Sequence, residues 1–346
     1  MKKILFTGGG SAGHTVPNLA IIDDVLAYGD TEVCYIGTDG IEKGLITKRG
    51  IPYYTISCPK LIRGKEGWRN NVHIPSAFCR AVREAKAGLL TFRPDVVFSK
   101  GGYVALPVVF AARALKIPCI AHESDFSPGL ANRLSAGRCE TVFTSFPETA
   151  KRLRHGKYSG APMRASLTKH TKTEAIKALS IPLGAKVLLV LGGGSGSKTL
   201  NEAVLSNLKT LTAKYFVLHI CGKGNLPVAN FRSYRAFEYF SDIGLLYAVA
   251  DGVVSRAGAG AVFELISLQK PALFIPLAGA TRGDQAENAE YFRSRGLCHV
   301  LEQTAIENLP QAVDKLFADT KLKTRLKETA LPSGNAVIVR ALRERT

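Results

Sequence analysis

The sequence lacks several of the patterns that mark whole classes of protein. Its seven cysteines are an odd number and none has C-x-x-C spacing, which argues against a disulfide framework or a zinc site and fits a reducing compartment. The longest apolar stretch, Tyr103–Ala121, is interrupted by prolines and basic residues and is a poor membrane span. The apolar run Ile4–Phe6 is too short for a signal peptide. No Asp-x-Asp pair occurs, so one common way of holding a divalent cation is missing.

The charge of the chain is strongly unbalanced. There are 46 lysines and arginines against 28 acidic residues, a formal net charge of +18. Such an excess favours a negatively charged partner, and nucleic acid, an anionic membrane and a phosphorylated ligand all qualify. A general solubility charge is the alternative. We find no recognisable RNA- or DNA-binding motif, so a nucleic-acid partner is not expected.

The order of apolar runs indicates the fold. The chain has 346 residues, of which 46% are hydrophobic, and this length suggests two packed domains. Short apolar runs alternate with helical sequence, a pattern typical of βαβ units and a parallel sheet. The runs are 3–7, 32–36, 96–99, 118–122 and 141–144 in the first half, with a helix expected at 17–27, and 186–191, 215–220, 252–255 and 272–275 in the second.

We therefore predict an α/β fold of two doubly wound domains with parallel sheets. The domains are expected at 1–162 and 163–333, with the join near Gly160–Arg164. A final helix at about 334–346 is expected to pack back on the first domain.

A glycine-rich turn follows the first strand of each half. Gly8, Gly10 and Gly13 satisfy G-x-G-x-x-G between a strand and a helix, where backbone N–H groups can approach a phosphate. Gly192–Gly196 repeats this placement. A plain tight turn is the alternative, and the motif alone is weak. A dinucleotide would require an acidic residue after the second strand, and Asp39 comes somewhat late, so a dehydrogenase is the second choice among enzymes.

His14 directly follows the first glycine turn. An imidazole with an ordinary pKa near 6.5 can accept a proton at neutral pH. A histidine at a helix start that only makes local hydrogen bonds is the competing interpretation.

Six segments, in order along nearly the whole chain, resemble the MurG family of peptidoglycan glycosyltransferases. They are Gly8–Pro17 (GGGSAGHTVP), Phe98–Val104 (FSKGGYV), His122–Gly129 (HESDFSPG), Gly160–Arg164 (GAPMR), Ser255–Glu264 (SRAGAGAVFE) and Gly283–Asn288 (GDQAEN). The resemblance implies the GT-B fold, with two Rossmann-like domains facing a cleft. It also implies transfer of N-acetylglucosamine from UDP-N-acetylglucosamine to lipid I, the undecaprenyl-diphospho-N-acetylmuramoyl-pentapeptide, which gives lipid II.

The resemblance also assigns roles to residues. Arg164 matches an arginine at the donor diphosphate, and Glu264 a glutamate at the ribose hydroxyls, although a surface arginine and a first-turn acid are the ordinary alternatives. Phe240 falls where the family's backbone contacts uracil. The other positions expected to border substrate are Ser11, Ala12, Gly13, Asp125, Gly194, Ser195, Ala259, Gly260, Ala261, Val262, Phe263, Asp284, Gln285 and Asn288.

Two positions depart from the family pattern. Asp125 replaces an asparagine that contacts the sugar, and an ionised aspartate only accepts hydrogen bonds. The second turn reads G-G-G-S-G where the family commonly has G-G-S-Q-G, so its hydroxyl has moved from 194 to 195 or its contacts are made by the backbone.

The implied chemistry is a direct displacement with inversion at the anomeric carbon. His14 is the first choice of base, with Glu123 and Asp125 as weaker candidates. Arg164 and helix N-termini would stabilise the leaving diphosphate without a required metal or other cofactor.

Residues 60–93 suggest how such a chain would reach a lipid acceptor. Apolar residues are interspersed with eight basic ones, which are Lys60, Arg63, Lys65, Arg69, Arg80, Arg83, Lys86 and Arg93. This composition suits peripheral docking on an anionic membrane at its cytoplasmic face. An ordinary amphipathic helix covering the sheet explains the pattern equally well. Another sugar transferase, an epimerase and a nucleic-acid-binding protein remain as alternative functions.

Overall fold

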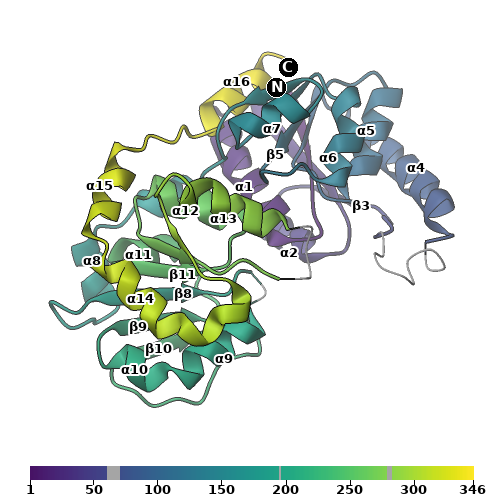
Figure 1. Ribbon diagram of the computed structural model, residues 1–346. Helices are drawn as coiled ribbons and strands as arrows, with labels where there is room; N and C mark the ends of the chain where they lie inside the picture. Colours follow the sequence, from purple (N-terminus) through teal and green to yellow (C-terminus); the bar gives the residue numbers. More distant parts are fainter. Residues whose placement is uncertain (61–70, 195, 279–282) are drawn as a thin grey trace. The chain divides into compact units, whose positions relative to one another are not determined.

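The computed structural model describes residues 1–60, 71–194, 196–278 and 283–346. The chain forms two compact units (Figure 1). The first comprises residues 1–164 and 332–346, and the second comprises residues 165–331. Each is built around a parallel sheet, which confirms the predicted fold class.

The first unit contains a sheet of seven strands within its described residues, in the order β3-β2-β1-β4-β5-β6-β7. The strands are β1 Lys2–Thr7, β2 Thr31–Gly37, β3 Tyr53–Thr55, β4 Val96–Ser99, β5 Cys119–Glu123, β6 Thr141–Thr144 and β7 Gly156–Tyr158. All adjacent pairs are parallel. The central strands are buried on both faces, which explains why they read as continuous apolar runs.

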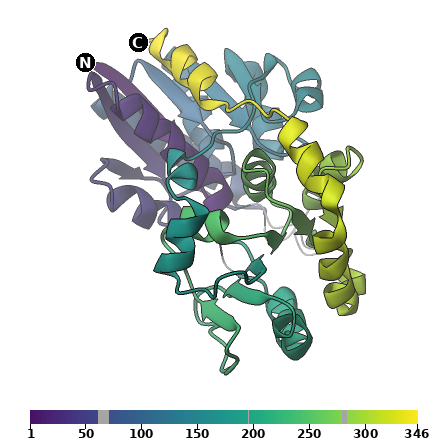
Figure 2. The same ribbon diagram turned by 90° about the vertical axis from the view of Figure 1, so that its left-hand side faces the viewer.

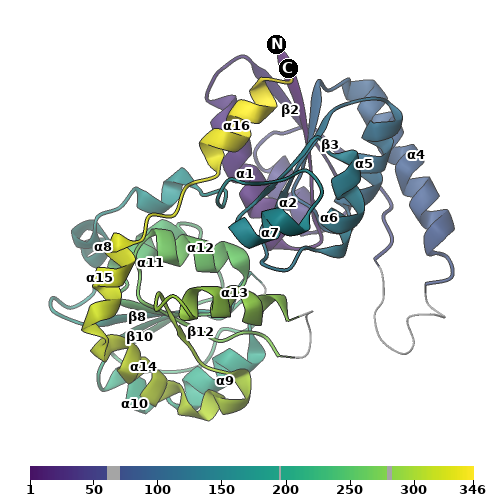
Figure 3. The same ribbon diagram turned by 45° about the horizontal axis from the view of Figure 1, so that its top comes forward.

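Helices cover both faces of this sheet. They are α1 Ala12–Leu26, α2 Ile41–Thr47, α4 Ile74–Phe92, α5 Ala105–Ala114, α6 Leu130–Ser135, α7 Pro147–Arg152 and α16 Asn335–Arg343. Helices α1, α2 and α16 lie on one face of the sheet, and α4 and α5 lie on the opposite face (Figure 3). Side chains of the first group fill one hydrophobic cluster, and those of the second group fill another. The sheet is therefore doubly wound.

The predicted start of the first helix was wrong. From the sequence a helix was expected at about 17–27. Helix α1 instead begins at Ala12, directly after Ser11 in an extended conformation, and Pro17 lies inside it. The helix N-terminus therefore belongs to the glycine turn itself.

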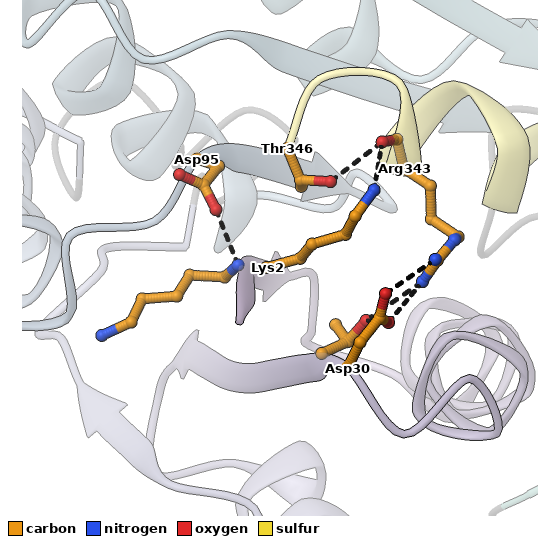
Figure 4. Close-up of polar contacts among 7 residues, drawn as sticks. Lys2, Asp30, Asp95, Arg343 and Thr346 are labelled. Atoms are coloured by element: carbon orange, nitrogen blue, oxygen red, sulfur yellow. Dashed lines mark hydrogen bonds and ion pairs between the residues drawn. The ribbon is translucent and has the colours of Figure 1, made fainter.

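The last helix returns to the first unit, where it packs against α1. The Arg343 guanidinium donates to both carboxylate oxygens of Asp30, at 2.7 and 2.9 Å (Figure 4). This pairing lowers the pKa of the Asp30 carboxyl. The Lys2 ammonium donates to the Arg343 carbonyl at 2.8 Å, so residues near both ends of the chain lie side by side (Figure 2).

The second unit repeats the architecture with six strands among its described residues, in the order β10-β9-β8-β11-β12-β13. The strands are β8 Val187–Leu191, β9 Phe216–Ile220, β10 Tyr234–Phe237, β11 Gly252–Ser255, β12 Ala272–Phe274 and β13 His299–Val300. The helices are α8 Lys172–Ala178, α9 Lys198–Ser206, α10 Leu208–Thr212, α11 Ile243–Val249, α12 Ala259–Ser267, α13 Asp284–Arg293, α14 Leu309–Ala318 and α15 Thr320–Glu328.

Candidate active site

Each sheet has a point at which the strand order reverses. In the first unit β1 lies between β2 and β4, and in the second β8 lies between β9 and β11. Ligands of such open sheets bind outside the carboxyl ends of the strands at this point. The two glycine turns follow β1 and β8, so both occupy these positions.

The first glycine turn packs closely against the segment after β4. A Cβ atom on Gly10, whose φ is +81°, would lie 2.5 Å from Cε1 of Tyr103. A Cβ atom on Gly102 would lie 2.5 Å from the carbonyl oxygen of Gly9. Segments 8–17 and 98–104, which both resemble MurG motifs, are thus packed against each other. The packing leaves no room for a side chain at Gly10 or Gly102.

A buried carboxylate supports this turn. Glu42, fully buried in α2, accepts hydrogen bonds from the Gly10 amide at 3.3 Å and from the Thr38 amide and hydroxyl at 3.1 and 2.6 Å. Sequence analysis missed Glu42, because an isolated glutamate near a helix start gives no pattern that distinguishes it from a surface residue.

His14 lies in the first turn of α1, half-buried. Its Nδ1 is 3.2 Å from the carbonyl oxygen of Lys100, and since a carbonyl only accepts, Nδ1 carries the proton and Nε2 carries the lone pair. Burial lowers the pKa of His14, and the Lys100 ammonium lowers it further, whereas Asp125 and Glu42 raise it. The net direction is downward, which favours a neutral imidazole able to accept a proton.

The two acidic residues after β5 differ in their contacts. The buried Glu123 carboxylate accepts from the Asp125 amide at 3.0 Å, the Gly129 amide at 2.8 Å and Nδ2 of Asn132 at 2.9 Å. These bonds hold the loop that carries Asp125, so Glu123 acts on that loop and is poorly placed to take a proton from a substrate. Asp125 is half-buried on the same loop.

The N-terminus of α1 supplies the other predicted residues of the first unit. Ser11 and Gly13 are exposed and Ala12 is half-buried. The first N–H groups of a helix have no partner within it, so these residues present backbone donors and the positive end of the helix dipole.

In the second unit, a buried arginine joins the ends of three strands. Arg256, which follows β11, donates through Nε and Nη2 to the Ser197 hydroxyl at 3.1 and 2.7 Å, and through Nη1 to the carbonyls of Ile275 and Pro276 at 3.1 and 3.4 Å. Ser197 also caps α9. Neither residue was among the predicted site residues, although Arg256 lies in a quoted motif. Gly194 is exposed in the same turn, whereas Ser195 lies outside the described residues.

Helix α12 begins directly after this arginine. Val262 and Phe263 are buried in the core, so only their backbone atoms could approach a ligand. Ala259 is also buried, whereas Gly260 is exposed and Ala261 half-buried.

Glu264 lies in the second turn of α12, where its Oε2 accepts from the Tyr247 hydroxyl at 3.2 Å. The alternative of a first-turn acid favoured by the helix dipole therefore does not apply.

The residues predicted in α13 form part of the same edge. The Gln285 Oε1 accepts from the Leu277 amide at 3.1 Å, and Nδ2 of the buried Asn288 donates to the Ala257 carbonyl at 3.3 Å. Asp284 is half-buried and is the first residue of α13. These contacts connect α13 to the segments after β11 and β12.

Comparisons with known proteins show which family the chain belongs to. A relative in Bacillus cereus, named UDP-N-acetylglucosamine--N-acetylmuramyl-(pentapeptide) pyrophosphoryl-undecaprenol N-acetylglucosamine transferase 2, is 42% identical over 338 residues, 95% of each chain. A Clostridium perfringens relative with the same name, without the final number, is 44% identical over 313 residues, covering 88% of this chain and 87% of its own. The chain belongs to the MurG family. It is a glycosyltransferase.

Family models and solved structures agree with this assignment. The N-terminal domain model of glycosyltransferase family 28 matches residues 4–144, and the C-terminal domain model matches residues 187–338. The crystal structure of Acinetobacter baumannii MurG has a TM-score of 0.77 at 24% identity and covers 99% of this chain and 100% of its own. The calicheamicin glycosyltransferase has a TM-score of 0.71 at 15% identity, covering 99% and 97%. These two structures show the shared fold.

Two residues assigned through the MurG resemblance lie apart from the glycine turns in the sequence. Arg164 is half-buried at the end of the first unit's main segment. Phe240 is half-buried after β10 and its ring packs edge-on against Phe237, with centroids 5.0 Å apart. Their predicted roles stay predictions.

The basic segment is described only in part. Helix α4 buries Ala81, Ala85, Gly88 and Leu89, whereas Arg80, Arg83 and Lys86 are exposed. Helix α4 thus covers the sheet with one face and carries basic residues on the other. Its structure is compatible both with an ordinary sheet-covering helix and with docking on an anionic membrane. Arg63, Lys65 and Arg69 lie outside the described residues.

Two features are absent from the described parts of this MurG family member. There, no helix is both long and apolar enough to cross a membrane. Nor do three or more His, Cys, Asp or Glu side chains come together as a metal site in those parts.

Proposed function

We propose that this enzyme transfers N-acetylglucosamine from UDP-N-acetylglucosamine to lipid I and so forms lipid II. The observation that carries the proposal is the 42–44% identity, over most of the chain, to relatives named for that transfer. The neutral His14 beside the first glycine turn supports it, because the reaction requires a base for the acceptor hydroxyl.

In the proposed reaction, Nε2 of His14 takes the proton of the acceptor sugar hydroxyl. The oxygen attacks the anomeric carbon of the donor, UDP leaves from the opposite face, and the configuration inverts. The bond from Nδ1–H to the Lys100 carbonyl leaves the lone pair on Nε2 before the proton is transferred. Asp125 and the backbone of Ser11–Gly13 border the acceptor or the transferred sugar in this proposal.

The donor is proposed to bind the second unit. The Glu264 carboxylate would accept hydrogen bonds from both ribose hydroxyls, and the backbone of Phe240 would contact uracil. The N-terminus of α12, together with Arg164, would neutralise charge on the departing diphosphate. Asp284 and Gln285 would contact the sugar hydroxyls, and Asn288 would orient these two side chains. The glycine turn after β8 would approach the donor through its backbone.

The decisive test is transfer of labelled sugar from UDP-N-acetylglucosamine to a lipid I analogue, with and without EDTA. We expect inverted product and activity that survives the chelator, since helix N-termini and arginine supply the positive charge. Absence of transfer, together with no rise in the melting temperature on adding UDP-N-acetylglucosamine, would rule out the donor assignment. Activity that EDTA abolishes and Mg²⁺ restores would contradict the metal-free mechanism alone.

We also propose that the exposed basic face of α4 docks on anionic lipid at the cytoplasmic face of the membrane. The double variant Arg83→Glu/Lys86→Glu should bind phosphatidylglycerol-containing vesicles at least about tenfold more weakly, since each basic residue near such a surface contributes about 1 kcal/mol. Co-sedimentation measures the binding. The control is Lys321→Glu/Lys323→Glu on α15, where the same charge change affects exposed residues of the second unit. Equal loss in both variants would indicate a general charge effect instead of docking through α4.

A further inference from the structure

Lys100, which directly follows β4, carries a buried ammonium group that neither the motif nor the proposed reaction explains. Its side chain is only 1% exposed, and its ammonium donates one hydrogen bond, to the Ser124 hydroxyl at 2.6 Å. Within the described residues no carboxylate forms an ion pair with it. Burial lowers the pKa of Lys100 to about 8, although Glu123 and Asp125 act in the opposite direction. Such a buried charge is costly, and its retention calls for a reason.

The position of Lys100 connects His14 to the loop after β5. The Lys100 carbonyl accepts from Nδ1 of His14, while its ammonium binds Ser124, the residue before Asp125. The Lys100 Cβ lies under the glycine turn, only 3.0 Å from where a Cβ on Gly8 would be. One residue therefore contacts the turn, the histidine and the acidic loop.

Charges of both signs act on the His14 ring. Asp125 on the loop after β5 and Glu42 on α2 favour the protonated imidazolium, and Lys100 opposes them. Burial lowers the pKa of the neighbouring His122, whose Nε2 is 3.2 Å from the Gly160 carbonyl oxygen, and Lys100 lowers it further. Asp125 stands where the family pattern has a neutral asparagine, so this chain has an extra negative charge beside its histidine.

We propose that Lys100 is a positioning residue for the transfer reaction: its carbonyl orients the His14 ring, and its buried ammonium offsets the Asp125 carboxylate so that His14 stays neutral. This inference rests on the proposed function, in which His14 is the base. It identifies Lys100 and Asp125 as a compensating pair that acts through His14.

The test is Lys100→Met, which removes the charge and keeps an unbranched side chain only one atom shorter. NMR titration of histidine-labelled protein, assigned with His14→Gln, should show a higher pKa for His14 in the variant. In the transfer assay, kcat/KM on the acid limb should fall by about 3- to 10-fold. Above pH about 8 the variant and wild type should converge, because Lys100 is itself deprotonated there. In the double variant Lys100→Met/Asp125→Asn, the pKa of His14 should return toward its wild-type value.

The variant should fold. The pKa of Lys100 lies below its ordinary value of 10.5, so the unfolded chain binds that proton more tightly than the folded one. The protonation of Lys100 therefore opposes folding, in full below pH about 8 and progressively less as the pH rises to 10.5. Lys270→Met is the control, since Lys270 is a half-buried lysine whose pKa is also lowered to about 8 by burial but which lies in the second unit. It should leave the His14 titration unchanged.

Any of three results would overturn the inference. An unchanged His14 titration in Lys100→Met, or a loss of kcat/KM that is equal at every pH, removes the role of Lys100 while leaving the base assignment intact. Full activity in His14→Gln instead removes the base assignment, and the role of Lys100 in the reaction with it.

Discussion

Replacing His14 by glutamine is expected to lower kcat by about 100- to 10,000-fold, the range associated with loss of a positioned base. Glutamine keeps a polar side chain of similar size but cannot accept a proton. Because most of the expected donor contacts lie in the second unit and none is made by His14, UDP-N-acetylglucosamine should still raise the melting temperature of the variant. Steady-state kinetics with a lipid I analogue and a thermal-shift titration make these two measurements.

The pH profile of the wild-type enzyme provides a second check on His14. The pKa of this histidine is lowered from its ordinary value of 6.5, so the neutral form that accepts a proton persists to lower pH than in a free imidazole. Activity should therefore be lost only as the pH falls below 6.5. His73→Gln, at an exposed histidine next to α4, is the control that should keep both rate and profile in solution. A His14→Gln enzyme with near-normal kcat would exclude His14 as the base.

Replacing Glu264 by glutamine should mainly weaken donor binding. Hydrogen bonds to a charged group contribute about 1.5–3 kcal/mol, so KM for UDP-N-acetylglucosamine should rise by about 10- to 100-fold with a smaller change in kcat. The melting-temperature rise caused by UDP should shrink in parallel. Initial rates at varied donor concentration measure the effect.

Two variants separate ribose recognition from other effects of Glu264→Gln. Tyr247→Phe removes the hydroxyl that donates to Glu264 but keeps the carboxylate, and it should raise KM by only about threefold or less. Glu290→Gln removes an exposed carboxylate of α13 that pairs with Arg293, and it should leave donor KM unchanged. A Glu264→Gln enzyme with normal donor KM would exclude the ribose contact.

Much of the fold could be predicted because buried parallel strands must be apolar. Runs such as Val96–Ser99 and Val187–Leu191 have no polar alternation, and the glycine turns mark where each half begins. The short strands β3 and β7 were not predicted, since three residues carry too little pattern. The start of α1 was missed because Pro17 is tolerated inside the helix.

Residues of the candidate site could be predicted only where they lie in a recognisable sequence motif. His14 and Glu264 were found through recognisable segments, whereas Glu42, Ser197 and the roles of Lys100 and Arg256 became visible only with the structure. Each is a polar side chain whose importance comes from burial and from partners distant in the sequence, such as Ile275 for Arg256. Single-residue identity does not reveal such burial, because most glutamates, serines and lysines lie at the surface.

The return of α16 to the first unit has a consequence for how the protein is made. Residues 332–346 belong to a unit whose other residues end at 164, so the second unit is, in topological terms, an insertion within the first. On the ribosome, the whole inserted unit is synthesised before Ile338 and Leu342 can complete the hydrophobic cluster around α1. During synthesis, therefore, the second unit can finish folding before the first. Until the last helix has been synthesised, the hydrophobic surface around α1 that it covers stays exposed on the first unit.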